Sequence, residues 1–322
     1  MRILTGSEVF NKNFIKSAVT IGNFDGVHRG HVVLFNRLKE ISTAHGLPSV
    51  VVTFEPHPLK VLSPDSAPSL ITTFDQKITL ISDSGVDCLV VVPFTMELSQ
   101  MSAEDFVVRI LCESLGMRHI LIGHDYAFGR GREGSYETLE LLGLDHGFTL
   151  DDLEPIGHGN MIYSSSLVRN QLLSGDMTAV SGILGRYYMI SGSVVHGREI
   201  GHAIGFPTAN ISTSNELLPP DGVYAVMALI EGRLIKGACN IGVNPTFGGG
   251  SRTIEVFLLD FSGQIYGNEI AVYFVQKLRE VMKFPDADSL VKAISNDVER
   301  TRTILNDIQE DMIKPKVITG TL

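Results

Sequence analysis

The chain has 322 residues, a length that favours two domains over one. Hydrophobic residues make up 44% of it and charged residues 19%, which is ordinary for a globular protein and enough to fill two cores. The net charge of −10, without a run of lysine or arginine, argues against a nucleic-acid-binding surface.

The cysteines and the apolar runs indicate where the protein works. Cys88, Cys112 and Cys239 are scattered and form no Cys-x-x-Cys pair, which disfavours a disulfide framework or a zinc site and favours a reducing compartment. Residues 1–6 lack the apolar region of a signal peptide, and apolar runs such as 89–93 are too short to cross a bilayer. We therefore expect a soluble, cytoplasmic protein without membrane contacts, and the sequence leaves self-association open.

A strand, a glycine-bearing loop and a helix are the first predicted elements. The apolar run 18–21 precedes the ten residues GNFDGVHRGH at 22–31, and a helical pattern of apolar residues follows. The loop glycines let the backbone approach a ligand closely. His28 and His31 share one face of the first helical turn, where free N–H groups and the helix dipole attract anions. The loop therefore suits a nucleotide phosphate, and a tight turn with two surface histidines is the plainer interpretation.

This loop resembles the His-x-Gly-His loop of nucleotidylyltransferases. Its full pattern, Gly-x-Phe-Asp-Gly-Val-His-x-Gly-His, is similar to that of the adenylyltransferase half of the bacterial bifunctional riboflavin kinase/FMN adenylyltransferases, or FAD synthetases. The resemblance implies that His28 and His31 are catalytic. It also implies that ATP is bound by the residues at the start of the loop, which are Gly22, Asn23, Phe24, Asp25 and Gly26.

The next predicted strand, 49–54, ends in the sequence Glu-Pro-His-Pro. Its two prolines fix a loop at the carboxyl end of the strand, where ligands bind in open parallel sheets. The segment Thr-Phe-Glu-Pro-His-Pro resembles the family here, and the resemblance implies that Pro56, His57 and Pro58 bind flavin. A plain loop residue is the alternative for His57.

Further strands are predicted at 88–92 and 119–123, with a helix between them that Ser102 caps. Strands that alternate with helices indicate βαβ units and a mostly parallel sheet. The family resemblance identifies this α/β region as a Rossmann-like nucleotidylyltransferase domain.

The glycine-rich loop 123–134 follows the last of these strands. A flexible surface loop is one interpretation. The loop also resembles the family segment that contacts flavin, which implies that Phe128 packs against the isoalloxazine ring and that Asp125 accepts its hydrogen bonds.

Three serines and an arginine stand at a later predicted helix start. Capping of free N–H groups alone would account for Ser164, Ser165 and Ser166. With Arg169 they resemble the family motif Ser-Ser-Thr-x-(Ile/Val)-Arg, which implies that they hold ATP phosphates. The chain contains no Gly-x-x-x-x-Gly-Lys-Ser/Thr segment, so it is not a P-loop enzyme.

The implied adenylyl transfer needs charge neutralisation rather than a base. The FMN phosphate is already ionised at neutral pH when it attacks the α-phosphorus of ATP. In-line positioning and cationic groups therefore suffice. His28, His31, Arg169 and Mg²⁺ can supply the charge, and Asn23 adds a neutral donor.

The pattern changes near Gly185. After it come short predicted strands with glycine and proline turns, at 189–195, 223–229, 234–241, 253–259 and 270–275. This spacing favours an antiparallel barrel or sandwich, and a closing helix is predicted at 289–308. With the resemblance, this implies an FMN adenylyltransferase domain at 1–184 and a riboflavin kinase domain of the barrel type at 185–322.

The segment Gly-Phe-Pro-Thr-Ala-Asn at 205–210 is the clearest motif of the second half. Thr208 and Asn210 offer hard oxygen ligands that suit Mg²⁺, and a structural turn is the alternative. The motif resembles the signature of riboflavin kinases. The resemblance implies that ATP is bound by Gly205, Pro207, Thr208 and Asn210, with the metal on the last two.

Glu255 is a single acid inside an apolar predicted strand. It is either an outward-facing residue or the base that the family places there. The 5′-hydroxyl of riboflavin is not ionised at neutral pH, so its phosphorylation benefits from a carboxylate that accepts the proton. The chain departs from the family pattern at Ile200, His202 and Val281.

Together these motifs predict a Mg-ATP-dependent bifunctional transferase that converts riboflavin to FMN and FMN to FAD. Two alternatives stay open at this point. One is a nucleotidylyltransferase of another substrate, because a His-x-Gly-His loop identifies only a superfamily. The other is a flavin-binding protein whose kinase half has decayed, which the three departures suggest.

Overall fold

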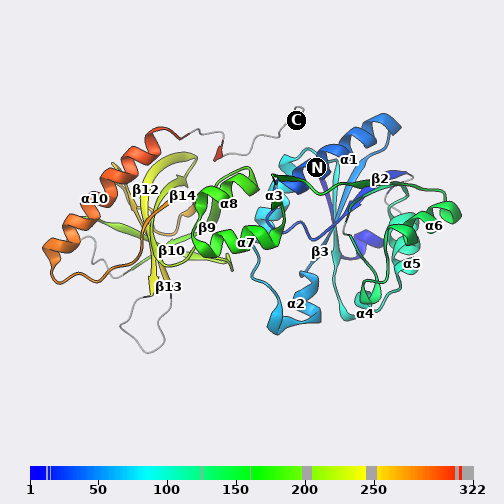
Figure 1. Ribbon diagram of the computed structural model, residues 1–322, viewed down its shortest axis with the longest axis horizontal. Coiled ribbons are helices and arrows are strands. Elements are labelled where there is room, and N and C mark those ends of the chain that lie inside the picture. The colour runs from blue at the N-terminus through cyan, green and yellow to red at the C-terminus, as the bar shows by residue number, and fades with distance from the viewer. Residues whose placement is uncertain are drawn as a thin grey trace. The chain divides into compact units, whose positions relative to one another are not determined.

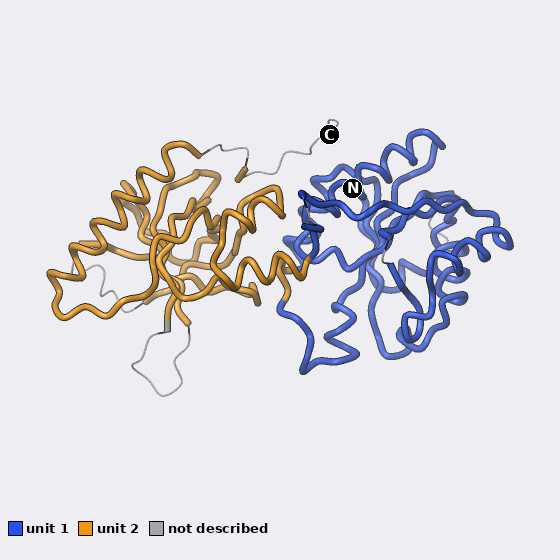
Figure 2. Tube along the Cα trace, in the orientation of Figure 1, with its two compact units in different colours: residues 1–69, 74–164, 317–322 blue, residues 70–73, 165–316 orange. Residues whose placement is uncertain are grey.

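The computed structural model describes residues 1–11, 14, 16–124, 126–159, 161–197, 205–243, 252–308 and 312–313. The chain forms two compact units (Figure 2), which we call unit 1 and unit 2. The described part of unit 1 lies within 1–69 and 74–164, and that of unit 2 within 70–73 and 165–316. The units divide after Ser164 because helices α7 (Ser165–Ser174) and α8 (Met177–Leu184) pack together, and α8 packs on strands of unit 2.

Unit 1 is built on a six-stranded sheet with the order β1-β4-β3-β2-β5-β6, in which every neighbouring pair is parallel. This confirms the predicted α/β class. The strands are β1 (Arg2–Thr5), β2 (Ser17–Ile21), β3 (Ser49–Glu55), β4 (Cys88–Pro93), β5 (Met117–Gly123) and β6 (Thr149–Leu153), with a small hairpin of β7 (Gly157–His158) and β8 (Met161–Ile162) after them.

Helices cover both faces of this sheet (Figure 1). The helical segments are η1 (Gly6–Phe10), α1 (Arg29–His45), α2 (Pro58–Leu62), η2 (Pro64–Ser66), α3 (Phe74–Asp83), α4 (Met96–Ser99), α5 (Ala103–Asp105), η3 (Phe106–Ser114), η4 (Arg130–Arg132) and α6 (Tyr136–His146). Successive strand residues point to opposite faces, so Val51 packs with α1 and α3, and Val50 with η3 and α6. Strands buried on both faces explain the continuous apolar runs of the sequence. The predicted cap is confirmed, because the Ser102 hydroxyl accepts from the Asp105 N–H at 3.0 Å.

The sheet order brings three predicted site loops to one edge. The strands are parallel, so the loops after β2, β3 and β5 all leave from their carboxyl ends. β2 lies between β3 and β5, and the chain order reverses between β2 and β5. Ligands bind at such a switch point in open α/β sheets, which is where the His-x-Gly-His loop stands.

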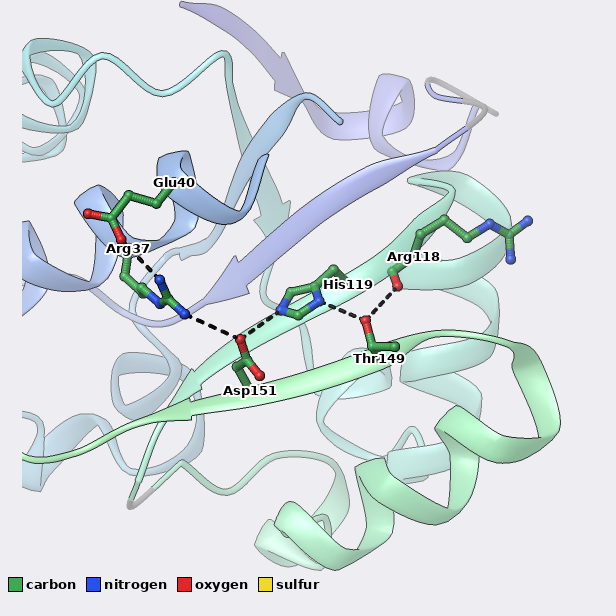
Figure 3. Close-up of polar contacts among 6 residues, drawn as sticks. All are labelled: Arg37, Glu40, Arg118, His119, Thr149 and Asp151. Carbon is green, nitrogen blue, oxygen red and sulfur yellow. Dashed lines mark hydrogen bonds and ion pairs between the residues drawn. The ribbon is translucent and has the colours of Figure 1, made fainter. Parts of the chain in front are cut away.

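A polar chain ties α1 to the other end of β5 and β6 (Figure 3). His119 of β5 lies between Thr149, whose Oγ1 is 2.7 Å from its Nδ1, and Asp151, whose Oδ2 is 3.5 Å from its Nε2. The Thr149 hydroxyl donates to the Arg118 carbonyl at 3.4 Å. Arg37 of α1 extends the chain to Asp151 at 3.9 Å. His119 is buried, and this burial lowers its pKa.

Unit 2 contains a closed antiparallel barrel with the order β10-β13-β12-β11-β14-β9. This confirms the predicted barrel with its final helix. Its elements after α8 are β9 (Tyr188–Val195), β10 (Thr208–Thr213), β11 (Gly222–Ile230), β12 (Arg233–Val243), β13 (Arg252–Leu258), β14 (Glu269–Arg279) and α10 (Ala287–Asn306).

Helix α10 closes the barrel by packing on β11, β12 and β14 (Figure 1). Its apolar face joins a core cluster through Leu305. Asp297, with a side chain 4% exposed, accepts from the Nε of Arg279 on β14 through Oδ1 at 3.1 Å and from its Nη2 through Oδ2 at 2.7 Å. This bidentate ion pair fixes the helix against the strand.

Candidate active sites

The His-x-Gly-His loop is a strained connection between β2 and α1. Phe24 and Val27 have positive φ angles of 50° and 38°, and Gly26 has a φ of 79°. Positive φ is costly for residues other than glycine and is concentrated at functional sites. A Cβ on Gly22 would lie 2.7 Å from the Phe24 ring, so this position requires glycine.

The two histidines meet at the start of α1. His28 is the N-cap of the helix, and its ring stacks on that of His31 with 3.6 Å between centroids and 24° between planes. The edge of Phe24 supports His31 at 5.1 Å. His28 is only 5% exposed, so it is not the surface histidine of the plainer interpretation. The stacked rings lie together at the start of α1, where free N–H groups and the helix dipole attract anions, and we call this place the histidine corner.

The loop and the start of α1 pack closely against neighbouring segments of unit 1. A Cβ on Gly30 would lie 3.1 Å from the His28 ring and 3.7 Å from the Tyr163 carbonyl. The Thr53 hydroxyl of β3 donates to the Asn23 carbonyl at 3.2 Å. The loop is therefore packed from both sides. Asn23 is exposed and Asp25 is buried, at 4%.

The residues predicted to bind flavin in the loop after β3 also form the start of helix α2. His57 is 9% exposed and is the N-cap of α2, where its Nδ1 accepts from the Leu59 N–H at 3.2 Å. Pro58 is the first residue of this helix and Pro56 is exposed. Capping explains why a histidine and a proline stand together here. Flavin binding by these residues stays a prediction.

Phe128 lies deeper than the resemblance suggests. It is 7% exposed and belongs to the core cluster of unit 1, beside Phe106 at 6.3 Å. Tyr126 stacks on it at 5.9 Å and 12° and is the more exposed ring. A Cβ on Gly134 would lie 2.7 Å from the Phe128 ring, which accounts for that glycine. Asp125 lies outside the described residues.

The serine motif begins helix α7, as predicted. Ser164 precedes the helix and is half-buried, Ser165 opens it, and Ser166 is exposed. Arg169 follows one turn later and is half-buried. Ser165, Ser166 and Arg169 belong to unit 2 and Ser164 to unit 1. Their role in ATP binding stays a prediction.

In the barrel, the predicted base and the predicted metal ligand are direct cross-strand neighbours. Asn210 of β10 pairs with Glu255 of β13, which pairs in turn with Asn240 of β12. All three are half-buried, whereas Ala209 and Val256 beside them are buried. They therefore share the outer face of the barrel, with neighbouring Cβ atoms about 5 Å apart. We call them the Asn–Glu–Asn row, and Asn240 is the member that the sequence analysis missed.

The Gly-Phe-Pro-Thr-Ala-Asn segment is half turn and half strand. Gly205 has a φ of +85° and Pro207 is exposed, but Thr208 already begins β10, opposite Phe257. The ideal Cβ position at Gly197 lies 2.0 Å from the Asn210 amide, so only a glycine backbone fits against that side chain. The departures at Ile200 and His202 lie outside the described residues, and Val281 is 50% exposed.

The barrel face offers oxygen ligands for a divalent cation. Two amide oxygens flank one carboxylate in the Asn–Glu–Asn row, and Thr208 adds a hydroxyl on the same face of β10. Such a hard donor set fits Mg²⁺. The described residues also hold an exposed group of His124, Asp152 and Glu154 whose ligand atoms lie within 4.8 Å of one another.

A parallel sheet with a histidine pair at its switch point and a barrel with an acid–amide row define a two-site transferase of nucleotide substrates. Family models described as FAD synthetase and riboflavin kinase match residues 10–167 and 184–305. The bifunctional riboflavin kinase/FMN adenylyltransferase of Pseudomonas fluorescens is 38% identical, covering 94% of this chain and 98% of its own length. The corresponding protein of Escherichia coli K12 is 37% identical, and the match covers 87% of this chain and 90% of that protein. The chain belongs to the family of bifunctional riboflavin kinase/FMN adenylyltransferases.

One solved structure extends this likeness to the whole fold. A crystal structure described as a macrolide-efflux protein from Streptococcus pneumoniae superposes with a TM-score of 0.84 and 30% identity. It covers 91% of this chain and 97% of that chain. Among the described residues of the present chain, no helix is both long and apolar enough to span a membrane.

Proposed function

We propose that this chain makes FAD from riboflavin in two ATP-dependent steps. Unit 2 phosphorylates riboflavin to FMN and releases ADP. Unit 1 transfers an adenylyl group from a second ATP to FMN and releases pyrophosphate. The observation that carries the proposal is that each unit assembles its own motif, namely stacked His28 and His31 at a helix start and Glu255 beside Asn210 on the barrel.

In the adenylyl transfer, an FMN phosphate oxygen forms a bond to the α-phosphorus while the bond to the pyrophosphate oxygen breaks. Negative charge builds on the phosphates, and no proton has to be removed. His28, His31 and the N–H groups at the start of α1 would stabilise that charge and hold the phosphates in line. Gly22 and Asn23 would lie close to the nucleotide.

In the kinase reaction, Glu255 would accept the proton of the riboflavin 5′-hydroxyl as its oxygen bonds to the γ-phosphorus and ADP leaves. A half-buried carboxylate flanked by two amides is held in place by its neighbours yet can meet a substrate. Thr208 and Asn210 would hold Mg²⁺, which would supply charge neutralisation at the ATP phosphates.

We assign the adenylyltransferase to residues 1–184 and the kinase to 185–322. The first matched family region ends within α7 and the second begins at the last residue of α8, so we place the boundary at the end of α8. We also place the reactions in the cytoplasm, because Cys88, Cys112 and Cys239 are free thiols. Riboflavin, FMN and ATP are the partners, and nucleic acid and membranes are not.

One assay tests both activities. The wild-type chain is given riboflavin, ATP and Mg²⁺, and FMN, FAD, ADP and pyrophosphate are each measured. His28→Ala with His31→Ala should stop FAD formation from FMN and spare FMN formation. Glu255→Gln should lower FMN formation from riboflavin by about 100-fold and spare FAD formation when FMN is supplied instead of riboflavin.

Each failure has a separate meaning. Pyrophosphate release that does not depend on FMN would favour a nucleotidylyltransferase of another substrate. Flavin binding without ADP release would favour a decayed kinase half. Unchanged riboflavin phosphorylation in the Glu255→Gln variant would exclude this residue as the base.

A further inference from the structure

Unit 1 contains a buried lysine close to its candidate site. Lys77 on α3 is 7% exposed, although lysine is almost never buried without a partner. Its Nζ lies 3.5 Å from the Glu55 Oε2 and 3.4 Å from the Phe54 carbonyl oxygen. Both partners are at the carboxyl end of β3.

A second acid reaches the same ammonium from the His-x-Gly-His loop. Burial lowers the pKa of Lys77, while the charges of Glu55 and then Asp25 raise it. Asp25 is itself 4% exposed and lies three residues before His28. The ammonium thus lies 3.5 Å from a carboxylate at the end of β3 and also feels the charge of a carboxylate in the loop after the adjacent strand β2.

The position of this charge suits a site for polyphosphate. Buried acids beside an ATP site would repel its phosphates, and a buried cation offsets them. The loop also carries positive φ angles at Phe24 and Val27, which persist only when the surrounding structure holds them. A cation held at the end of β3 that also attracts Asp25 of the loop can supply that hold.

We propose that Lys77 is a positioning residue for adenylyl transfer, whose ammonium joins Asp25 to Glu55 and so fixes the loop that carries His28 against β3. The inference rests on the proposed function of unit 1. Lys77 itself does not touch the reacting atoms in this role. It acts through the loop, and its removal leaves the buried Asp25 and the half-buried Glu55 to repel each other and the incoming nucleotide.

The test compares three variants of the full chain. Lys77→Met keeps the length of the side chain and removes its charge. Lys77→Arg restores the charge, and Lys39→Met is the matched control, because Lys39 of unit 1 donates only to the Ser84 carbonyl, at 2.6 Å, in the contacts described. FAD formation from FMN and FMN formation from riboflavin are measured separately in each.

Lys77→Met should lower kcat/KM for FAD formation by about 100-fold, since misplacement of a site by about 1 Å costs that much. Lys77→Arg should recover activity to within about tenfold of the wild type, and Lys39→Met should match the wild type. FMN formation should stay unchanged in all three. A Lys77→Met variant within threefold of the wild type would overturn the proposal.

Glu55→Gln keeps the test decisive if Lys77→Met fails to fold. This neutral, isosteric change should lower FAD formation by about tenfold, because it removes the charge that Lys77 meets at the end of β3. A lower melting temperature with unchanged kcat in Glu55→Gln would mean a purely structural role and would also overturn the proposal. If the wild type itself makes no FAD, it is the proposed function that fails.

Discussion

The substitution Gly30→Ala tests whether the position of the His28 ring matters for FAD formation. The added Cβ would lie 3.1 Å from the His28 ring, whereas ordinary contacts begin at 3.4 Å, so the ring must move by roughly 0.3–0.5 Å. Gly30 is the second residue of α1, where alanine is favoured over glycine by up to about 1 kcal/mol. The substitution should therefore keep or raise stability while it displaces the imidazole.

The expected loss of activity follows from that displacement. If a shift of 1 Å costs about 100-fold, then 0.3–0.5 Å costs about fivefold to tenfold in kcat/KM for FAD formation. The assay measures FAD from FMN and ATP, with the riboflavin kinase reaction of the same chain as internal control. Thermal unfolding reports the stability of unit 1 in parallel.

Two results would refute this reasoning. FAD formation at the wild-type rate would mean that the His28 ring can move without consequence. An equal loss of both activities would mean that the change acts through the whole chain and not through the histidine corner.

Three further outcomes are expected. Asp297→Ala leaves Arg279 without its buried partner and should lower the free energy of unfolding of unit 2 by about 3–5 kcal/mol, measured by urea denaturation with circular dichroism; a loss below 1 kcal/mol contradicts this. The burial that lowers the pKa of His119 makes its contribution to stability complete above about pH 6.5 and progressively lost as pH falls toward the folded-state pKa. His119→Gln should therefore flatten the acid side of the melting-temperature profile, and an unchanged profile would argue against it. Chelation by EDTA should abolish both activities and excess Mg²⁺ should restore them, whereas activity that survives dialysis against EDTA would remove the metal from the proposal.

The elements that the sequence could not predict are those that tertiary pairing creates. β6 has the sequence Thr-Leu-Asp-Asp-Leu, and its two aspartates are residues that are uncommon in strands. The strand forms because it pairs in parallel with β5. β10 follows a glycine and a proline, so the sequence indicates a turn where the barrel closes with a strand. The buried strands and α10 had clear periodicity, and their bounds agree to within a few residues.

Some residues of the candidate sites could be predicted from the sequence, and others needed the structure. Helical spacing was enough to place His28 and His31 on one face, and the structure confirms this. Lys77 was missed because a lysine on a helix ordinarily faces solvent. Its spacing could have indicated burial, because Lys77 stands three residues after Phe74 and four before Ile81, on the buried side of α3. Asn240 needed the register of the barrel, which no local pattern contains.

The two sheets differ in how they can come apart. The open sheet has end strands, β1 and β6, which can fray one at a time while the central strands stay paired. In the closed barrel every strand pairs with two neighbours, so separating any one pair of strands would leave two strand edges unpaired at once. We therefore expect the kinase half to melt in a single sharp step and the adenylyltransferase half to loosen gradually from its margins.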